Sequence, residues 1–272
     1  MDIKTMKKSD ETILLFKKAI FSKSKTGLLK TLHDKVIRSK NPLIIFTPNP
    51  EQLVLAQKDS QFSTYLDQAD VLIPDGIGLV WASKLHQLFG RSKAVTERIS
   101  GIDLATDLLE WAAKETWSVL LLGGRDYYQA RGQAIRLPAN SQLPKKLQLH
   151  WLEGYKEVGA PTRAEEDAVA QTLRSLKPKL VFVAFGAPMQ EKWVIEHLNL
   201  LEKSGTKLVM VVGGSFDVLF GRLKRAPLWV RVMGLEWLYR LLQEPHRARR
   251  QLALLSFIGM TINELFNPSK KA

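Results

Sequence analysis

Asp75 lies between Pro74 and Gly76, and Pro74 directly follows the short apolar run of residues 71–73. The run predicts a buried strand that ends at the proline, with a helix beginning beyond the glycine. Ligands of open α/β sheets bind in the crevice at the carboxyl ends of the strands. A carboxylate at this point is therefore either a helix cap or a base that takes a proton from a substrate.

Thr47 and Asn49 are two further short polar side chains at a predicted strand end. They follow the apolar run of residues 43–46 and alternate with Pro48 and Pro50. Side chains of this kind beside prolines commonly make turns, and turn chemistry is the simpler interpretation of both residues.

Glycines follow three of the predicted strands, as Gly123-Gly124, Gly186 and Gly213-Gly214. Glycine at a strand-to-helix turn lets the backbone approach a ligand and lets helix N–H groups face a phosphate. Tight turns are the alternative for each one, but three such turns together favour binding of a nucleotide. None of the three matches the dinucleotide or P-loop patterns.

Two polar residues lie in the first turns of helices that follow these glycines. Gln190 is placed to face the crevice, although a solvated helix start is the alternative. Asp217 has the same two interpretations, and a carboxylate is a suitable partner for ribose hydroxyls.

Residues 222–250 carry eight Lys or Arg residues and two Glu residues. Three of the cations, Arg240, Arg247 and Arg250, have spacings that one continuous helix would place on one face, but Pro245 interrupts that helix. A charge run of this kind is often a solvated helix. The interleaved tryptophans and leucines favour contact with lipid headgroups instead.

The whole chain of 272 residues has a formal net charge of +13, which implies an anionic partner. It has no cysteine, its five histidines are scattered, and it lacks an Asp-x-Asp pair, so we expect no metal site unless folding brings carboxylates together. We also expect no cofactor. The N-terminus does not resemble a signal peptide, and no stretch is apolar enough to span a bilayer. We therefore expect a cytoplasmic protein that either stays in solution or attaches to a membrane surface.

Predicted strands and helices alternate through most of the chain, which is typical of an α/β fold with a mostly parallel sheet and helices on both faces. Residues 1–40 have a helical pattern rich in lysine. The alternation stops near residue 221, and we expect a catalytic domain over 1–221 and a helical appendage over 222–272. Strands are predicted at 43–47, 71–73, 118–122, 147–151, 180–185 and 207–212, and helices from residue 50 and at 61–69, 77–88, 101–114, 127–135, 164–176 and 190–203.

Several ordered motifs resemble those of the WecG/TagA/CpsF glycosyltransferases. They are TPNPE at 47–51, PDGIG at 74–78, ERISGID at 97–103, AFGAPMQEKW at 184–193, GGSFD at 213–217, RAP at 225–227 and GLEWLYR at 234–240. The resemblance covers roughly residues 40–250. It implies a Rossmann-like core with a C-terminal appendage, and transfer of a sugar from a UDP-sugar to a lipid-linked sugar with inversion and without a required metal.

The resemblance also implies roles for the candidate residues. Asp75 becomes the general base, and Thr47 and Asn49 line the pocket for the sugar and the acceptor. Gln190 lies near the donor sugar or the acceptor, and Asp217 lies near the uridine.

The remaining roles concern the donor diphosphate, over which the appendage arginines Arg240, Arg247 and Arg250 would close. The acceptor implied is a polyprenyl-diphosphate-linked sugar at the cytoplasmic face of the cell membrane. The donor sugar implied is N-acetylmannosamine or its uronic acid, in cell-wall polysaccharide or teichoic acid synthesis. Oligomeric state is left open, a homo-oligomer included.

Two other functions use the same observations. A nicotinamide-dependent oxidoreductase would share the sheet but lacks the glycine fingerprint and the acidic ribose residue that follows it. A nucleic-acid-binding protein would use the positive charge, but no recognition motif is present, so we expect no nucleic-acid partner.

Overall fold

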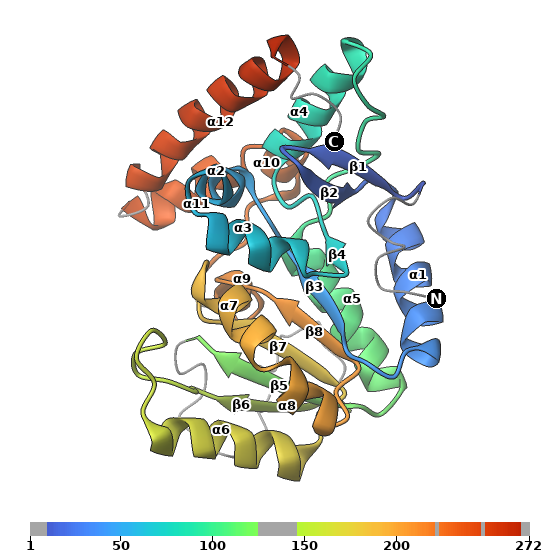
Figure 1. Cartoon of the computed structure of the whole chain (residues 1–272), viewed down its shortest axis with the longest axis vertical. Coiled ribbons are helices and arrows are strands. Elements are labelled where there is room, and N and C mark those ends of the chain that lie inside the picture. Colours follow the sequence, from blue (N-terminus) through green and yellow to red (C-terminus); the bar gives the residue numbers. More distant parts are fainter. Residues whose placement is uncertain (1–9, 125–145, 221–222, 246–247, 268–272) are drawn as a thin grey trace. The chain divides into compact units, whose positions relative to one another are not determined.

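The computed structural model describes residues 10–124, 146–220, 223–245 and 248–267, with the backbone alone at 248–251. Its contacts divide the chain into two compact units (Figure 1). Unit 1 comprises Met1–Gly27, Thr47–Ser100 and Leu223–Ala272, and unit 2 comprises Leu28–Phe46 and Gly101–Arg222. These units reflect contacts alone, so the division into a catalytic domain over 1–221 and an appendage over 222–272 stays a prediction.

Unit 2 contains five parallel strands in the order β3-β8-β7-β5-β6. All or most residues of each strand except β6 are buried, as expected for strands covered on both faces. The elements are α1 (Lys25–Arg38, which belongs to this unit from Leu28 on), β3 (Leu43–Phe46), α5 (Gly101–Lys114), β5 (Ser118–Gly123), β6 (Gln148–Leu152), α6 (Arg163–Leu176), β7 (Leu180–Ala184), α7 (Met189–Glu196), α8 (Leu198–Lys203), β8 (Leu208–Val211) and α9 (Ser215–Leu219).

Unit 1 contains three strands, of which β1 and β2 are antiparallel and β2 and β4 are parallel. Its C-terminal helix α12 packs along α2. The elements are β1 (Thr12–Leu15), β2 (Lys18–Phe21), α2 (Pro50–Lys58), α3 (Ser60–Asp67), β4 (Val71–Leu72), α4 (Ile77–Leu88), α10 (Leu228–Val232), α11 (Glu236–Gln243) and α12 (Ala248–Phe266).

The predicted α/β class with a mostly parallel sheet is confirmed, and each predicted strand is present. The predicted helix at 127–135 lies outside the described residues. The predicted helix at 190–203 is instead two helices, α7 and α8, that meet at His197. The His197 ring contacts the Trp193 carbonyl at 2.9 Å and Glu166 at 3.1 Å, and its backbone leaves the helical region there.

The predicted helical pattern over 1–40 is wrong for residues 12–21, which form a β-hairpin. Ile13 and Leu15 are buried while Leu14 between them is exposed, which is the two-residue period of a strand. The turn places Phe16 and Lys17 at positive φ, of 52° and 62°. Neither is a usual residue for such a turn, so the sequence lacked the signal of a hairpin.

Candidate functional site

Asp75 lies in a sharp turn of unit 1 between β4 and α4. Its N–H donates to the Ile73 carbonyl at 2.9 Å across Pro74, a three-residue turn that the fixed φ of proline favours. The N-cap of α4 is Gly76, so Asp75 stands one residue before the cap position. The half-buried carboxylate therefore does not occupy the position that the capping interpretation gave it.

Close packing against Pro50 explains the glycines that follow Asp75. A Cβ on Gly76, whose φ is +106°, would lie 3.2 Å from Pro50 Cδ and 3.9 Å from Asn49 Cβ. A Cβ on Gly78 would lie 2.7 Å from Pro50 Cγ and 3.6 Å from Phe257 of α12. The structure thus brings the turn of Asp75 beside Asn49 and Pro50.

Asn49 is the N-cap of α2. Its side-chain oxygen accepts the Gln52 N–H at 2.9 Å, and the Gln52 side chain accepts the Asn49 N–H at 3.1 Å, which completes a capping box. Asn49 therefore caps a helix, and its role in the sugar and acceptor pocket stays a prediction. Thr47 directly follows β3 and is buried, with 8% of its surface exposed.

In unit 2 the turns after β7 and β8 are joined by Gln190. Its side-chain oxygen accepts the N–H groups of Gly186 and Gly213, both at 3.2 Å. Both glycines have positive φ, of 80° and 48°, and a Cβ on either would meet no atom of the described residues within 4 Å. Gln190 is 2% exposed, so the solvated helix start considered for it is wrong.

The other candidates of unit 2 differ in their surroundings. Gly214 is the N-cap of α9, and Asp217 lies half-buried in the first turn of that helix. Gly123 has φ +87°, and a Cβ there would lie 2.6 Å from the Phe185 ring, so close packing as well as conformation requires glycine. The turn after β5 is thus filled by an aromatic side chain, unlike those at Gly186 and Gly213.

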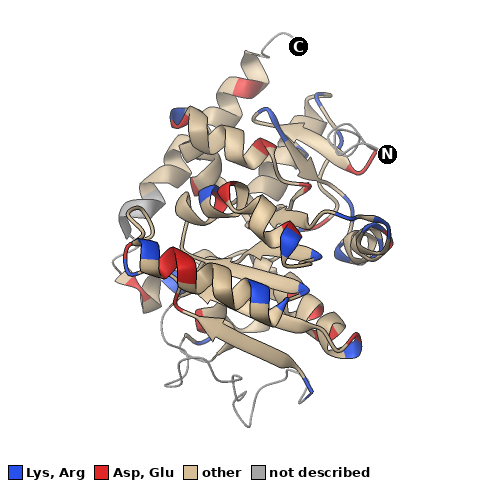
Figure 2. Ribbon diagram, turned by 60° about the horizontal axis from the view of Figure 1, so that its bottom comes forward, with Lys and Arg blue, Asp and Glu red and all other residues tan. Residues whose placement is uncertain are grey.

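The three appendage arginines are not on one continuous helix. Arg240 is on α11, where its Nε donates to Glu244 at 3.1 Å. Arg250 is on α12, for which the backbone alone is described at this residue, and Arg247 lies outside the described residues. The predicted interruption near Pro245 is confirmed, since α11 ends at Gln243 and α12 begins at Ala248. Lys and Arg occur on many elements of the described chain (Figure 2).

Two polar contacts of unit 1 were not predicted from the sequence. Arg98, in the ERISGID motif, makes an ion pair and hydrogen bond with Glu236, in the GLEWLYR motif. Side chains so far apart in the sequence carry no local signal of pairing. The ion pair connects the loop before Ser100 to the start of α11.

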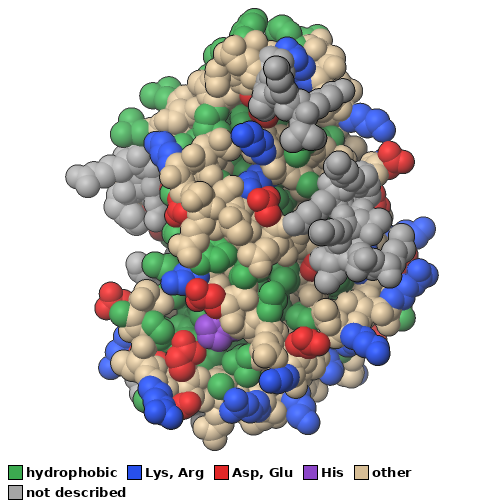
Figure 3. Space-filling view, in the orientation of Figure 1, with side chains coloured by type: hydrophobic (Ala, Val, Ile, Leu, Met, Phe, Trp, Pro, Cys, Tyr) green, Lys and Arg blue, Asp and Glu red, His purple; other side chains and the backbone are tan. Residues whose placement is uncertain are grey.

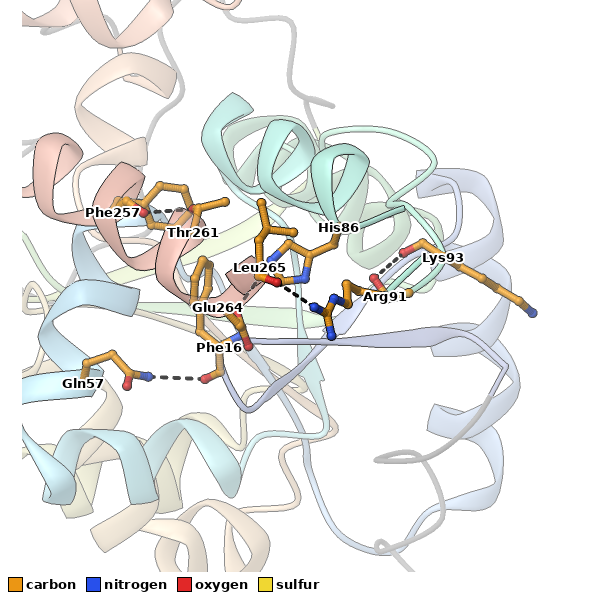
Figure 4. A network of polar contacts seen from close by, with 10 residues as sticks. Phe16, Gln57, His86, Arg91, Lys93, Phe257, Thr261, Glu264 and Leu265 are labelled. Carbon is orange, nitrogen blue, oxygen red and sulfur yellow. Dashed lines mark hydrogen bonds and ion pairs between the residues drawn. The ribbon is translucent and has the colours of Figure 1, made fainter. Parts of the chain in front are cut away.

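The second unpredicted contact is a network that holds α12 (Figure 4). Both carboxylate oxygens of Glu264 accept the Phe16 N–H at 3.2 Å, and His86 Nε2 lies 3.6 Å from the same carboxylate. Arg91 donates to the Leu265 carbonyl at 2.7 Å. Burial raises the pKa of Glu264. Burial also lowers the pKa of His86, and the positive charge of Arg91 lowers it further. Both shifts disfavour the charged forms of this pair.

Among the residues that the structure describes, no group of three or more His, Asp or Glu side chains is arranged to hold a metal ion. Among the same residues, no helix is long and apolar enough to cross a membrane.

Residues 15–271 match the model of the glycosyl transferase WecG/TagA/CpsF family. Similar curated proteins include an N-acetylglucosaminyldiphosphoundecaprenol N-acetyl-beta-D-mannosaminyltransferase of Bacillus subtilis, 30% identical over 88% of this chain and 86% of the relative. A protein of the same name from Staphylococcus aureus is 32% identical over 81% of this chain and 80% of the relative. The match thus spans both units and all the motifs named above.

Proposed function

Because the chain belongs to the WecG/TagA/CpsF family of glycosyl transferases, we propose that it transfers N-acetylmannosamine, or a related hexose or uronic acid, from a UDP-sugar to a lipid-linked sugar on a polyprenyl diphosphate. The names of relatives from two genera carry this proposal, since both specify an N-acetylmannosaminyl group and a diphosphoundecaprenol acceptor. Membership in a glycosyltransferase family leaves the oxidoreductase and nucleic-acid interpretations without support.

Asp75 is the proposed general base. As the acceptor hydroxyl oxygen attacks the anomeric carbon, Asp75 takes the hydroxyl proton, the new glycosidic bond forms, and the bond from that carbon to UDP breaks. Attack opposite the departing UDP inverts the anomeric centre. The position of Asp75 before the cap of α4 supports this role, because the carboxylate is held by a rigid turn of Pro74 and two close-packed glycines.

The turns at Gly186 and Gly213 are proposed to bind the nucleotide part of the donor, with Gly214 and Asp217 beside them. Their open glycine positions support close approach of a ligand to the backbone. Arg240, Arg247 and Arg250 would stabilise the negative charge that grows on the departing diphosphate, the kind of electrostatic term that is often large in catalysis. No step in this scheme calls for a metal ion.

The C-terminal helices are proposed to contact the cytoplasmic face of the membrane, where a polyprenyl acceptor would lie. On α12, Leu252, Leu255, Ile258, Ile262 and Phe266 are exposed at spacings of three or four, the pattern of one helix face. Hydrophobic side chains line the outer edge of this helix in Figure 3. Exposed Trp229 and Trp237 on α10 and α11 are suited to the headgroup region.

A panel of UDP-sugars tests the donor and acceptor together. Each is incubated with a short-chain lipid-diphosphate-N-acetylglucosamine analogue, and products are identified by mass. We expect a product one N-acetylhexosamine heavier with UDP-N-acetylmannosamine, and release of one UDP per product. Failure of every UDP-sugar in the panel to extend the analogue, with UDP also failing to bind, would contradict the proposal.

Membrane contact is tested separately with liposomes. We expect the full chain to sediment with vesicles containing anionic lipid, and Leu255→Ser with Ile262→Ser to weaken sedimentation without changing thermal stability. Equal sedimentation of the variant and the unchanged protein would argue against contact through this helix face.

A further inference from the structure

Gln190 is held between two backbone donors and one carboxylate. Its side-chain oxygen faces the N–H groups of Gly186 and Gly213, and its Nε2 donates to Glu191 Oε1 at 2.9 Å. A glutamine amide has an acceptor end and a donor end, and its Nε2 can only donate, here to Glu191 Oε1. Glu191 therefore selects the orientation in which the oxygen of Gln190 points to the two glycines.

The amide joins the turns after two adjacent parallel strands, β7 and β8. Both glycines have positive φ, and no atom of the part of the chain that the structure describes lies within 4 Å of either Cβ position, so packing of these residues does not fix the turns. Because both N–H groups donate to Gln190, they are directed at the protein and not at a phosphate. The role of Gln190 is thus to fix the turns, while other groups contact the ligand.

Glu191 is the second member of this pair, and its position costs stability. It is 1% exposed, and no atom of the described residues is a hydrogen-bond partner of its Oε2. Burial raises the pKa of its carboxyl to about 7, against which the Gln190 hydrogen bond acts. Costly buried carboxyls that do not serve the core are concentrated at functional sites.

We propose that Glu191 is a positioning residue that orients the Gln190 amide and thereby fixes the Gly186 and Gly213 turns for the nucleotide of the donor. The inference rests on the proposed function, because it takes these turns as the nucleotide site. Glu191 does not touch substrate. It accepts one hydrogen bond from Gln190 Nε2, and the Gln190 oxygen in turn accepts the N–H groups of Gly186 and Gly213.

Two nearly isosteric variants separate this role from simple packing. Glu191→Met fills the same volume without an acceptor, whereas Glu191→Gln restores one. Glu196→Gln is the matched control, because Glu196 is exposed on the same helix and the charge change is the same. UDP binding is measured by calorimetry, and the KM of donor and acceptor by initial rates.

We expect Glu191→Met to weaken UDP binding and raise the donor KM by about tenfold, the effect of losing one buried hydrogen bond. Glu191→Gln should restore both to within about twofold, and the acceptor KM should not change. A folded Glu191→Met variant with unchanged UDP affinity would overturn the proposal. So would an equal loss in Glu191→Met and Glu191→Gln.

Amide hydrogen exchange gives a readout that does not depend on the ligand. We expect the Gly186 and Gly213 amides to exchange about tenfold faster in Glu191→Met and unchanged in Glu196→Gln. Faster exchange in a protein that binds no UDP would uphold the positioning role and contradict the nucleotide site. Unchanged exchange in Glu191→Met would overturn the positioning role itself.

Discussion

Unit 1 and unit 2 each have glycines at the carboxyl ends of strands, but the reason that glycine is required differs between the two units. Beside Asp75, Gly76 and Gly78 are required by the close approach of Pro50, whose atoms lie 3.2 and 2.7 Å from the respective Cβ positions. At Gly186 and Gly213 no atom of the described residues comes within 4 Å of the Cβ position, and there the positive φ is what requires glycine. The first turn is rigid by packing, and the second pair is fixed by hydrogen bonds to one buried amide.

The difference matters for the chemistry proposed for each region. A base must be held within a fraction of an ångström of its proton, and packing of Pro50 on two glycines provides a stiff support. A nucleotide site must admit a ligand to the backbone, and open glycines provide room. The same residue type at a strand end therefore predicts a turn, but its neighbours decide whether the turn is filled or open.

The largest expected effect comes from removing the base in the packed turn. Asp75→Asn keeps the size of the side chain and removes its ability to take a proton, so we expect kcat to fall by about 10²–10⁴-fold with the Tm little changed. The control is Asp34→Asn, an exposed residue of α1, which should keep full activity. Wild-type turnover in a folded Asp75→Asn enzyme would remove Asp75 from the mechanism.

The second prediction concerns the buried amide pair and the pH dependence of stability. The pKa of Glu191 is about 7 in the folded protein and near the ordinary 4.5 when unfolded, so the folded state holds its proton over the range between these values. Stability due to this group therefore falls as pH rises from 4.5 to 7, by about 3 kcal/mol in total. Glu191→Gln cannot ionise and should not show this loss.

Urea unfolding at pH 5, 6, 7 and 8 measures the effect. We expect the free energy of unfolding of Glu191→Gln minus that of the wild type to increase by about 2–3 kcal/mol from pH 5 to pH 8. Glu196→Gln should show no comparable gain. A constant difference between Glu191→Gln and the wild type over this range would mean that the carboxyl is not buried as described.

A third prediction tests whether packing distinguishes the two kinds of glycine. Gly78→Ala should destabilise the protein by about 1–3 kcal/mol because its Cβ overlaps Pro50. In a Pro50→Ala background the same change should cost much less, so the double-mutant cycle should show coupling of about 1–2 kcal/mol. Gly186→Ala should cost about 1–2 kcal/mol for its φ in either background. Additive effects of Pro50→Ala and Gly78→Ala would contradict the packing account.

Much of the fold could be predicted from the sequence because its signals are local. The buried parallel strands are uninterrupted apolar runs, and the predicted helices 77–88 and 101–114 agree with α4 and α5 at both ends. The hairpin at 12–21 could not be predicted, since its turn is supported by Glu264, 248 residues from Phe16. Tertiary contacts there override the preferences of Phe16 and Lys17.

The candidate site was predictable to a similar extent. Strand-end positions pointed to Asp75, Gly186 and Gly213, because chain order alone shows where strands end. The partnership of Gln190 and Glu191 was not predictable, since polar residues in a first helical turn are usually solvated and only the packed fold shows both to be buried. The roles assigned to the arginines stay predictions.

The smallest expected effect separates the two possible roles of Asn49. Its oxygen caps α2, so Asn49→Ala should lower the free energy of unfolding by about 1 kcal/mol. Asn49→Ser keeps a capping oxygen but lacks the amide, and we expect it to restore stability while kcat/KM for the acceptor stays several-fold below the wild type. The two measurements are chemical denaturation and initial rates over acceptor concentration. If activity returned together with stability in Asn49→Ser, the residue would be a cap alone, and the packed turn of unit 1 would contribute Asp75 to the chemistry without a polar partner from the start of α2.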